Sequence, residues 1–184
     1  MKFELSAVTL RVARPDDALC LGVLATQVFL DNYATQGIRP AIAREVQAAC
    51  ATEACAALIA DPGGVVEVAE CDGHLVGFHE LRWRAGHELA PAGVQAELCR
   101  LYVQEPFVGR GLGSALLRAA QTRAREHGAS VLWLTAWVHN RRALGFYAAR
   151  GFADVGQTLF QFQGEAHENR VLAQRLDGPG LAGG

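Results

Sequence analysis

The sequence lacks several features that would assign the chain to a specialised class of protein. No apolar run reaches the roughly 18 residues of a membrane-spanning helix, and residues 1–17 contain no long apolar signal-peptide core. The net charge of −2 leaves no excess of basic residues of the kind that binds nucleic acid. We therefore expect a cytoplasmic protein with neither nucleic acid nor a membrane among its partners.

The sequence also lacks the residue groupings that hold metal ions or paired thiols. Its five cysteines form no C-x-x-C pair and lie within apolar patterns, which is typical of small buried residues in a reducing compartment. His127, His139 and His167 are scattered, without the spacing of metal ligands. We predict no metal site.

The composition is that of an ordinary globular domain. Of the 184 residues, 51% are hydrophobic and 20% are charged, which is enough apolar surface for a substantial core. We predict a single domain over residues 1–176. The remaining segment, 177–184, is rich in glycine and is expected to be a flexible tail.

The most informative stretch of the chain is a glycine-rich loop between a strand and a helix. Residues 97–103 form an apolar run that predicts a strand, and the helical spacing of apolar residues after Ser114 predicts a helix that ends at Gly128. Such a turn exposes backbone N–H groups at the positive end of the helix dipole, which favours a bound phosphate. Gly109, Gly111 and Gly113 let an anion approach the backbone closely.

Three interpretations of this loop compete. A nucleotide-hydrolase loop requires Gly-Lys-Ser/Thr, whereas this chain has Gly113-Ser114-Ala115. A dinucleotide fingerprint requires a third glycine at Ser114 and an acidic residue at the end of the following strand, and 131–138 supplies none. An ordinary turn without a ligand remains open on these residues alone.

The residues downstream of the loop distinguish between these interpretations. After a predicted strand at 131–138 comes a segment with the pattern N-x-x-A-x-x-F-Y-x-x-x-G-F, from Asn140 to Phe152. Together with the glycines of the loop, this pattern resembles the GNAT superfamily of acyl-CoA-dependent N-acyltransferases. The family's loop motif is R/Q-x-x-G-x-G/A, and its Arg/Gln position is occupied here by Val108. The likeness covers about a third of the chain and implies that acetyl-CoA is the cosubstrate.

The resemblance also implies which residues bind acetyl-CoA. The backbone of 101–103 is expected to hold the pantetheine arm as an added strand, and the loop amides are expected to hold the pyrophosphate. By this reading the acetyl-CoA-binding residues are Leu101, Tyr102, Val103, Val108, Gly109, Arg110, Gly111, Leu112, Gly113, Ser114, Asn140, Ala143 and Phe146. Composition alone also makes Asn140 a good helix N-cap.

Two residues are predicted to be catalytic. Amine acyl transfer needs a base, because a free alkyl amine is only about one part in a thousand neutral at pH 7. Glu97, at the start of the strand that leads into the loop, is our predicted base, with Glu80 and His139 as alternatives and a solvated strand-end residue as the non-catalytic reading. By resemblance Tyr147 is the acid that protonates the leaving thiolate.

The N-terminal half is predicted to form the acceptor side of the site. The patterns predict a strand at 8–13, helices from Pro15 to about Asn32 and from 41 to 60, and a hairpin with strands at 65–70 and 74–83. The resemblance implies that the helices flank the acceptor pocket. The predicted substrate-binding residues are Phe29, Asp31, Tyr33, His79 and Glu80, although the two aromatics and the histidine are also plausible core residues.

The resemblance fixes the expected fold and function. The fold class is α/β (α+β), a GNAT fold with a mixed, mainly antiparallel sheet of six or seven strands, flanked by about four helices. The predicted reaction is direct acetyl transfer from acetyl-CoA to a primary amine of a small molecule, and a weaker likeness points to the branch with bacterial polyamine acetyltransferases. The alternatives are a protein or peptide N-acetyltransferase and a non-catalytic acyl-CoA-binding domain. A homodimer is left open.

Overall fold

The computed structural model describes residues 5–162 and 165–176, which fold as two compact units. The first unit contains the chain up to Glu80 together with Arg100–Ala120, and the second contains Leu81–Cys99 and the chain from Gln121 onward. The expected single domain over 1–176 stays a prediction. The expected flexible tail, 177–184, lies outside the described residues.

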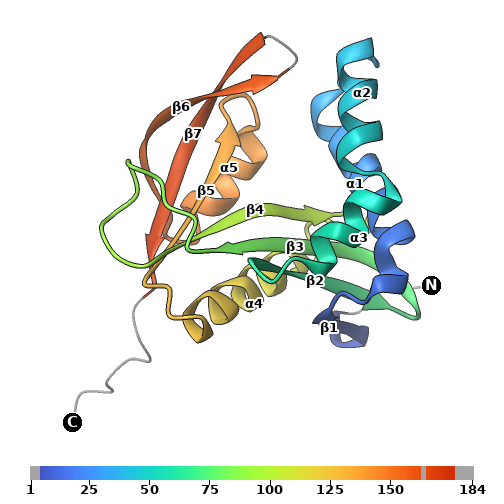
Figure 1. Cartoon of the computed structure of the whole chain (residues 1–184), viewed down its shortest axis with the longest axis horizontal. Coiled ribbons are helices and arrows are strands. Elements are labelled where there is room, and N and C mark those ends of the chain that lie inside the picture. Colours follow the sequence, from blue (N-terminus) through green and yellow to red (C-terminus); the bar gives the residue numbers. More distant parts are fainter. Residues whose placement is uncertain (1–4, 163–164, 177–184) are drawn as a thin grey trace. The chain divides into compact units, whose positions relative to one another are not determined.

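The elements follow the mixed order that the sequence predicts (Figure 1). The seven strands are β1 (Val8–Val12), β2 (Gly64–Cys71), β3 (His74–Trp83), β4 (Gln95–Val103), β5 (Val131–Trp137), β6 (Ala153–Phe162) and β7 (Glu165–Arg175). The five α-helices are α1 (Ala18–Tyr33), α2 (Pro40–Ala49), α3 (Thr52–Ala60), α4 (Leu112–Glu126) and α5 (Arg141–Ala148). Short 3₁₀ turns lie at Leu5–Ala7, Pro15–Asp17 and Glu105–Phe107.

The expectation of one helix over 41–60 is wrong, because the chain breaks between α2 and α3. Ala51 is extended, with φ −58° and ψ 147°. The break brings the Cys50 carbonyl against α1 at Gly22, into the space that a Cβ would occupy there. Tertiary packing against α1 therefore overrides the continuous helical pattern, and α2 and α3 replace the single expected helix.

The sheet is mainly antiparallel, as expected, with strand order β1-β2-β3-β4-β5-β7-β6. The β2–β3 turn has positive φ at Asp72 (51°) and Gly73 (79°), as the turn dipeptide predicts. One neighbouring pair, β4 and β5, is parallel, and its ladder covers three residue pairs, from Gln95↔Val131 to Glu97↔Trp133. Both strands continue past the point where this ladder ends.

The core of the first unit contains two hydrophobic clusters. In α1, Leu21, Leu24 and Val28 recur at helical spacing and pack with β2 and with Phe78 of β3. In the second cluster, leucines on one stripe of α4 pack with Ala69, Cys71 and Val76, beside Leu101 and Val103 of β4. Burial of each such leucine contributes about 1.5–3 kcal/mol.

The second unit is built around β5 and the long β6–β7 hairpin, drawn in orange and red in Figure 1. Val131, Trp133, Val171 and Ala173 form its buried cluster with Ala90. The Trp133 indole Nε1 donates a hydrogen bond of 2.7 Å to the Ala85 carbonyl, which ties the 84–94 loop to this core.

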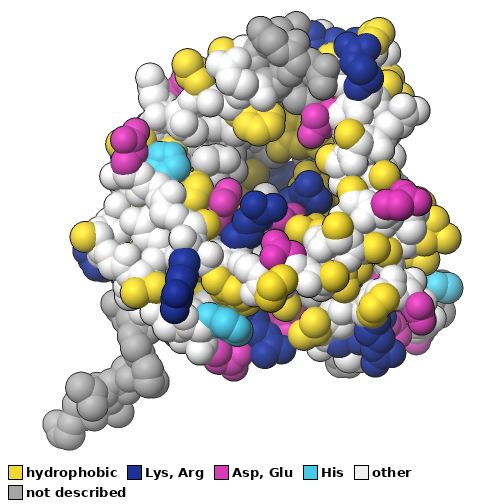
Figure 2. Space-filling model, in the orientation of Figure 1, with side chains coloured by type: hydrophobic (Ala, Val, Ile, Leu, Met, Phe, Trp, Pro, Cys, Tyr) yellow, Lys and Arg dark blue, Asp and Glu magenta, His cyan; other side chains and the backbone are white. Residues whose placement is uncertain are grey.

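None of the described helices is long and apolar enough to cross a bilayer. On the face drawn in Figure 2, basic and acidic side chains are interspersed rather than gathered by sign.

Candidate active site

The glycine-rich loop connects β4 to α4 and contains two glycines with positive φ. The chain leaves β4, makes the 3₁₀ turn at Glu105–Phe107 and enters α4 at Leu112. Gly109 and Gly111 have φ values of 74° and 87°, in the left-handed region that favours glycine. A Cβ added at Gly109 meets nothing within 4 Å, so open space lies over the loop at this residue.

Some N–H groups of the loop donate hydrogen bonds within the protein, and others do not. The Val108 N–H donates to the Glu105 carbonyl at 3.1 Å, and the Ala115 N–H begins the helix by donating to the Gly111 carbonyl at 3.0 Å. Within the described part of the chain, no hydrogen bond satisfies the N–H groups of Gly109 and Gly111, and those of Leu112 and Gly113 belong to the first turn of α4.

The start of α4 is therefore suited to an anion. Unsatisfied N–H groups and the positive end of the helix dipole both favour negative charge. Leu112 is fully buried and anchors the first turn, while Arg110 is exposed beside the two left-handed glycines. Ser114 is the third residue of α4 and belongs to the same first turn.

The strand before the loop offers its backbone rather than its side chains. Leu101 and Val103 pack toward α4, and Tyr102 packs on the opposite side against Phe78, with ring centroids 5.3 Å apart. Burial and the nearby Tyr33 raise the pKa of the Tyr102 phenol well above its ordinary value. With its side chains committed to packing, this part of β4 can bind a ligand through main-chain groups.

The residues of the second motif lie on and before α5, in the second unit. The Asn140 side chain accepts a 3.1 Å hydrogen bond from the Ala143 N–H, which confirms the predicted N-cap. Tyr147 is 7% exposed and makes edge contacts with Phe146 at 5.1 Å and Phe152 at 5.4 Å between ring centroids. These contacts fix the phenol ring within the hydrophobic surroundings of α5.

Glu97 lies in the same unit, at the last paired residue of the β4–β5 ladder. It is half-buried and lies opposite Trp133, whose side chain is buried. Because the ladder ends here, the β5-facing backbone groups of the following β4 residues have no partner in that ladder. A carboxylate thus marks the point where β4 leaves β5.

The predicted acceptor residues of the first unit fall into two environments. Phe29 and Tyr33 are half-buried on α1 and in contact, with ring centroids 4.8 Å apart, whereas Asp31 is exposed. His79 is fully buried, and its Nε2 lies 2.9 Å from Glu67 Oε2. Glu80 is also buried, with its Oε2 3.4 Å from Arg100 Nε.

Sequence reasoning missed two of these partners, Glu67 and Arg100. Both are charged residues inside otherwise apolar strand runs, and that position is the signal that could have identified them. The pKa of the Arg100 guanidinium is raised by Glu80, against the opposing effect of its own burial. The predicted site residues thus form one group in the first unit and a second group, with Glu97 and Tyr147, in the other.

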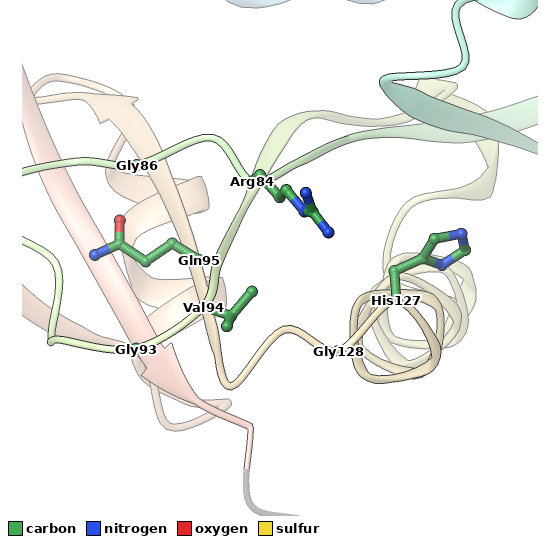
Figure 3. Close-up of a pocket in the computed structure, with 7 residues that line it drawn as sticks. All are labelled: Arg84, Gly86, Gly93, Val94, Gln95, His127 and Gly128. Carbon is green, nitrogen blue, oxygen red and sulfur yellow. The ribbon is translucent and has the colours of Figure 1, made fainter.

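Two further features of the described residues bear on possible ligand sites. Among the described residues, no group of three His, Cys, Asp or Glu side chains is placed to hold a metal ion. A solvent-open cavity of about 590 Å³ lies in the second unit, where the Arg84 and His127 side chains face one another (Figure 3). The cavity contains none of the predicted site residues, and His127 stacks on Trp83 at 3.9 Å between ring centroids.

Sequence comparison finds relatives among acetyltransferases. The model of the acetyltransferase (GNAT) family matches residues 31–152. An uncharacterised N-acetyltransferase of Lactobacillus delbrueckii subsp. lactis is 28% identical over 155 residues, covering 83% of this chain and 88% of that protein. An uncharacterised N-acetyltransferase of Mycobacterium bovis is 31% identical over 141 residues, which cover 74% of this chain and 85% of that protein.

Structural comparison agrees on the fold. The PaiA N-acetyltransferase of Thermoplasma acidophilum, solved in complex with coenzyme A, superposes with a TM-score of 0.71 at 20% sequence identity. The match covers 91% of this chain and 98% of that one. Because the family model spans well over half of the sequence and both expected motifs lie within its match, the chain belongs to the GNAT family of acetyltransferases.

Proposed function

We propose that this protein is an acetyl-CoA-dependent N-acetyltransferase that moves an acetyl group directly to a primary amine of a small molecule in a ternary complex. The observation that carries the proposal is the start of α4, where left-handed Gly109 and Gly111 precede a helix whose first N–H groups are available to an anion. The crystal structure of PaiA with coenzyme A supports the same ligand class.

The residues present fit coenzyme A at two places in the first unit. The pyrophosphate would take the amides between Gly109 and Ser114, where the space over Gly109 is open. The pantetheine arm would pair with the backbone of 101–103, since the β4–β5 ladder ends before these residues. By the family resemblance, Asn140, Ala143 and Phe146 are also proposed to bind coenzyme A.

Glu97 is the proposed general base. The acceptor amine must lose a proton to attack the thioester carbon, and a carboxylate at the end of the β4–β5 ladder can accept that proton directly or through water. The partial charge that develops on the carbonyl oxygen would be stabilised by a main-chain N–H of β4.

Tyr147 is the proposed general acid. As the new C–N bond forms and the C–S bond breaks, the departing thiolate needs a proton, and the Tyr147 phenol can supply it. Its ring is held by Phe146 and Phe152, so the hydroxyl direction is fixed before substrate binds. The products are the N-acetyl amine and free coenzyme A.

Acceptor binding is assigned to the first unit. Phe29 and Tyr33 would supply an apolar wall from α1, Asp31 a surface charge, and His79 and Glu80 the polar part of β3. All five cysteines are free, which supports a reducing, cytoplasmic setting. A homodimer stays a prediction.

Two measurements test the proposal. Calorimetry with acetyl-CoA should show binding to the purified, folded protein, and thiol release should accompany turnover with at least one member of a panel of small amines, amino acids and peptides. Absence of acetyl-CoA binding at millimolar concentration contradicts the proposal at its first step. Binding without thiol release from any acceptor favours the non-catalytic alternative.

A further inference from the structure

Arg100 occupies an unusual position for a cation. It lies in β4 within the run Glu-Leu-Cys-Arg-Leu-Tyr-Val, and 28% of its side-chain surface is exposed. The facing carboxylate, Glu80 of β3, is 5% exposed in its side chain. A guanidinium removed from water to this extent needs acceptors for its N–H groups.

The ion pair with Glu80 leaves most of the N–H donors of Arg100 without an acceptor among the described residues. The Arg100 Nε to Glu80 Oε2 distance is 3.4 Å, longer than the 2.7–2.9 Å of a charge-assisted hydrogen bond. A guanidinium carries five N–H donors. Within the described part of the chain, Arg100 makes this single ion-pair contact and no hydrogen bond.

Arg11, in the same unit, is an example of a guanidinium whose N–H groups donate to two carboxylates. Its Nη1 and Nη2 donate to the two Asp17 carboxylate oxygens at 2.7 and 2.9 Å. Its Nε and Nη2 also donate to Glu70 at 2.8 and 2.6 Å. Two carboxylates therefore bind Arg11, although its side chain is about as exposed, at 20%, whereas Arg100 has one carboxylate partner among the described residues.

Arg100 lies next to the hydrophobic cluster to which Tyr102 belongs. Tyr102, two residues along β4 and so on the same face, packs in the cluster formed with α1 and α3. Cys50, Cys55 and Tyr102 are close enough to interact electrostatically with the guanidinium, and Glu80 is the acidic group among its described neighbours. In such low-dielectric surroundings a second carboxylate would bind more strongly than at the surface.

We propose that Arg100 binds a carboxylate of the acceptor, so that the acceptors are amino acids or other amines that carry a carboxylate. This inference rests on the proposed acetyltransferase function and names its substrate class. The planar fork of Arg100 can bind a carboxylate in a bidentate geometry while Glu80 remains its ion-pair partner. A singly charged carboxylate suits the site better than a phosphate dianion, because the buried Glu80 already supplies one negative charge.

Matched acceptor pairs test the proposal in the transfer reaction. Several amino acids are compared with their carboxamides and with aminoalkyl phosphates, using kcat/KM from thiol release. The wild type should favour each acid over its amide, and Arg100→Gln should lower kcat/KM for the acids by about 10- to 150-fold while changing the amides by less than about threefold. The control is Arg82→Gln, the same change at an exposed arginine of β3.

A second variant covers the case in which Arg100→Gln does not fold, and a binding measurement tests the site without the transfer reaction. If Arg100→Gln alone fails to fold, Glu80→Gln with Arg100→Gln removes both charges and should lose selectivity for the acids in the same way. Calorimetry of N-acetyl amino acids without coenzyme A should show binding to the wild type and to Arg82→Gln, and none to the Arg100 variant.

The outcomes separate this inference from the proposed function. Equal losses for acids and amides in Arg100→Gln, a wild-type preference for amides or phosphates, or undiminished binding of N-acetyl amino acids to the variant each overturn the carboxylate site. Absence of acetyl-CoA binding overturns the transferase instead, and the calorimetry with N-acetyl amino acids still decides the role of Arg100.

Discussion

His79 and Glu67 form a hydrogen-bonded pair in the interior of the first unit, with 2.9 Å between His79 Nε2 and Glu67 Oε2. Their exposed fractions are 0% and 4%. The Glu67 carboxylate accepts the bond, and His79 Nδ1 has no hydrogen-bond partner among the described residues. Such a pair is costly to break, because removing one partner leaves the other polar group buried alone.

We expect Glu67→Ala to lower the free energy of unfolding by about 3–5 kcal/mol. The double variant Glu67→Leu with His79→Leu should recover most of this loss, since apolar residues of similar volume leave no buried polar group without a partner. Urea unfolding of Glu67→Leu, His79→Leu and the double variant measures the coupling. Additive losses in the double variant would show that the pair is not coupled.

The ion pair between Arg11 and Asp17 predicts a pH dependence of stability. Hydrogen bonds from Arg11, opposed by burial, hold the pKa of Asp17 below its ordinary value. The pair therefore contributes stability above about pH 4, the pKa of an unfolded aspartate, and loses it as the pH falls through the lower folded-state pKa. Asp17→Asn should cost about 1 kcal/mol at pH 7, and its difference from the wild type should vanish in strong acid.

Denaturant unfolding between pH 2 and pH 7 measures this difference. The control is Asp16→Asn, the same change at the neighbouring exposed aspartate, which should follow the wild type across the range. A constant gap between Asp17→Asn and the wild type at every pH contradicts the assignment.

Gly109→Val tests the loop that is proposed to hold coenzyme A. Nothing lies within 4 Å of a Cβ built at this position in the free protein, and the new side chain would enter the space that the pyrophosphate is proposed to occupy. We expect acetyl-CoA affinity, measured by calorimetry, to fall at least about tenfold. Strain at φ 74° should cost about 1–2 kcal/mol of stability.

Gly73→Val is the matched control for strain alone. Gly73 has nearly the same φ, 79°, and equally open space, but lies in the β2–β3 turn. It should lose similar stability and keep its affinity for acetyl-CoA. Equal affinity losses in the two variants would assign the effect of Gly109→Val to strain.

Tyr147→Phe should separate catalysis from binding. The ring contacts with Phe146 and Phe152 survive the change, so the fold and acetyl-CoA affinity should stay nearly constant. Loss of the proton donor should lower kcat by about 10²- to 10⁴-fold. Thiol release and calorimetry on the same preparation measure both quantities. Unchanged kcat would remove Tyr147 as the acid.

Glu97→Gln should lower turnover most at neutral pH. An amide cannot accept the amine proton, so the rate should depend on the fraction of acceptor that is already neutral. We expect the loss to shrink as the pH approaches the amine pKa near 10. A profile of kcat/KM against pH measures this recovery. A defect of the same size at every pH would assign Glu97 another role.

Features that depend on neighbouring residues could be predicted from the sequence. The turn at Asp72-Gly73 and the cap at Asn140 were both expected, because each is determined by the conformational preference or hydrogen bonding of a few adjacent residues. The resemblance to the family predicted a mixed, mainly antiparallel sheet of six or seven strands, and the structure has a seven-stranded sheet.

Only the tertiary structure decided the features that depend on distant residues. It divided the expected helix over 41–60, because packing of Cys50 against Gly22 outweighs local helix propensity. It also paired Glu80 with Arg100 and ended the β4–β5 ladder at Glu97. Charge burial and strand pairing join residues far apart in the chain, and no local pattern in this sequence records which partner each residue meets.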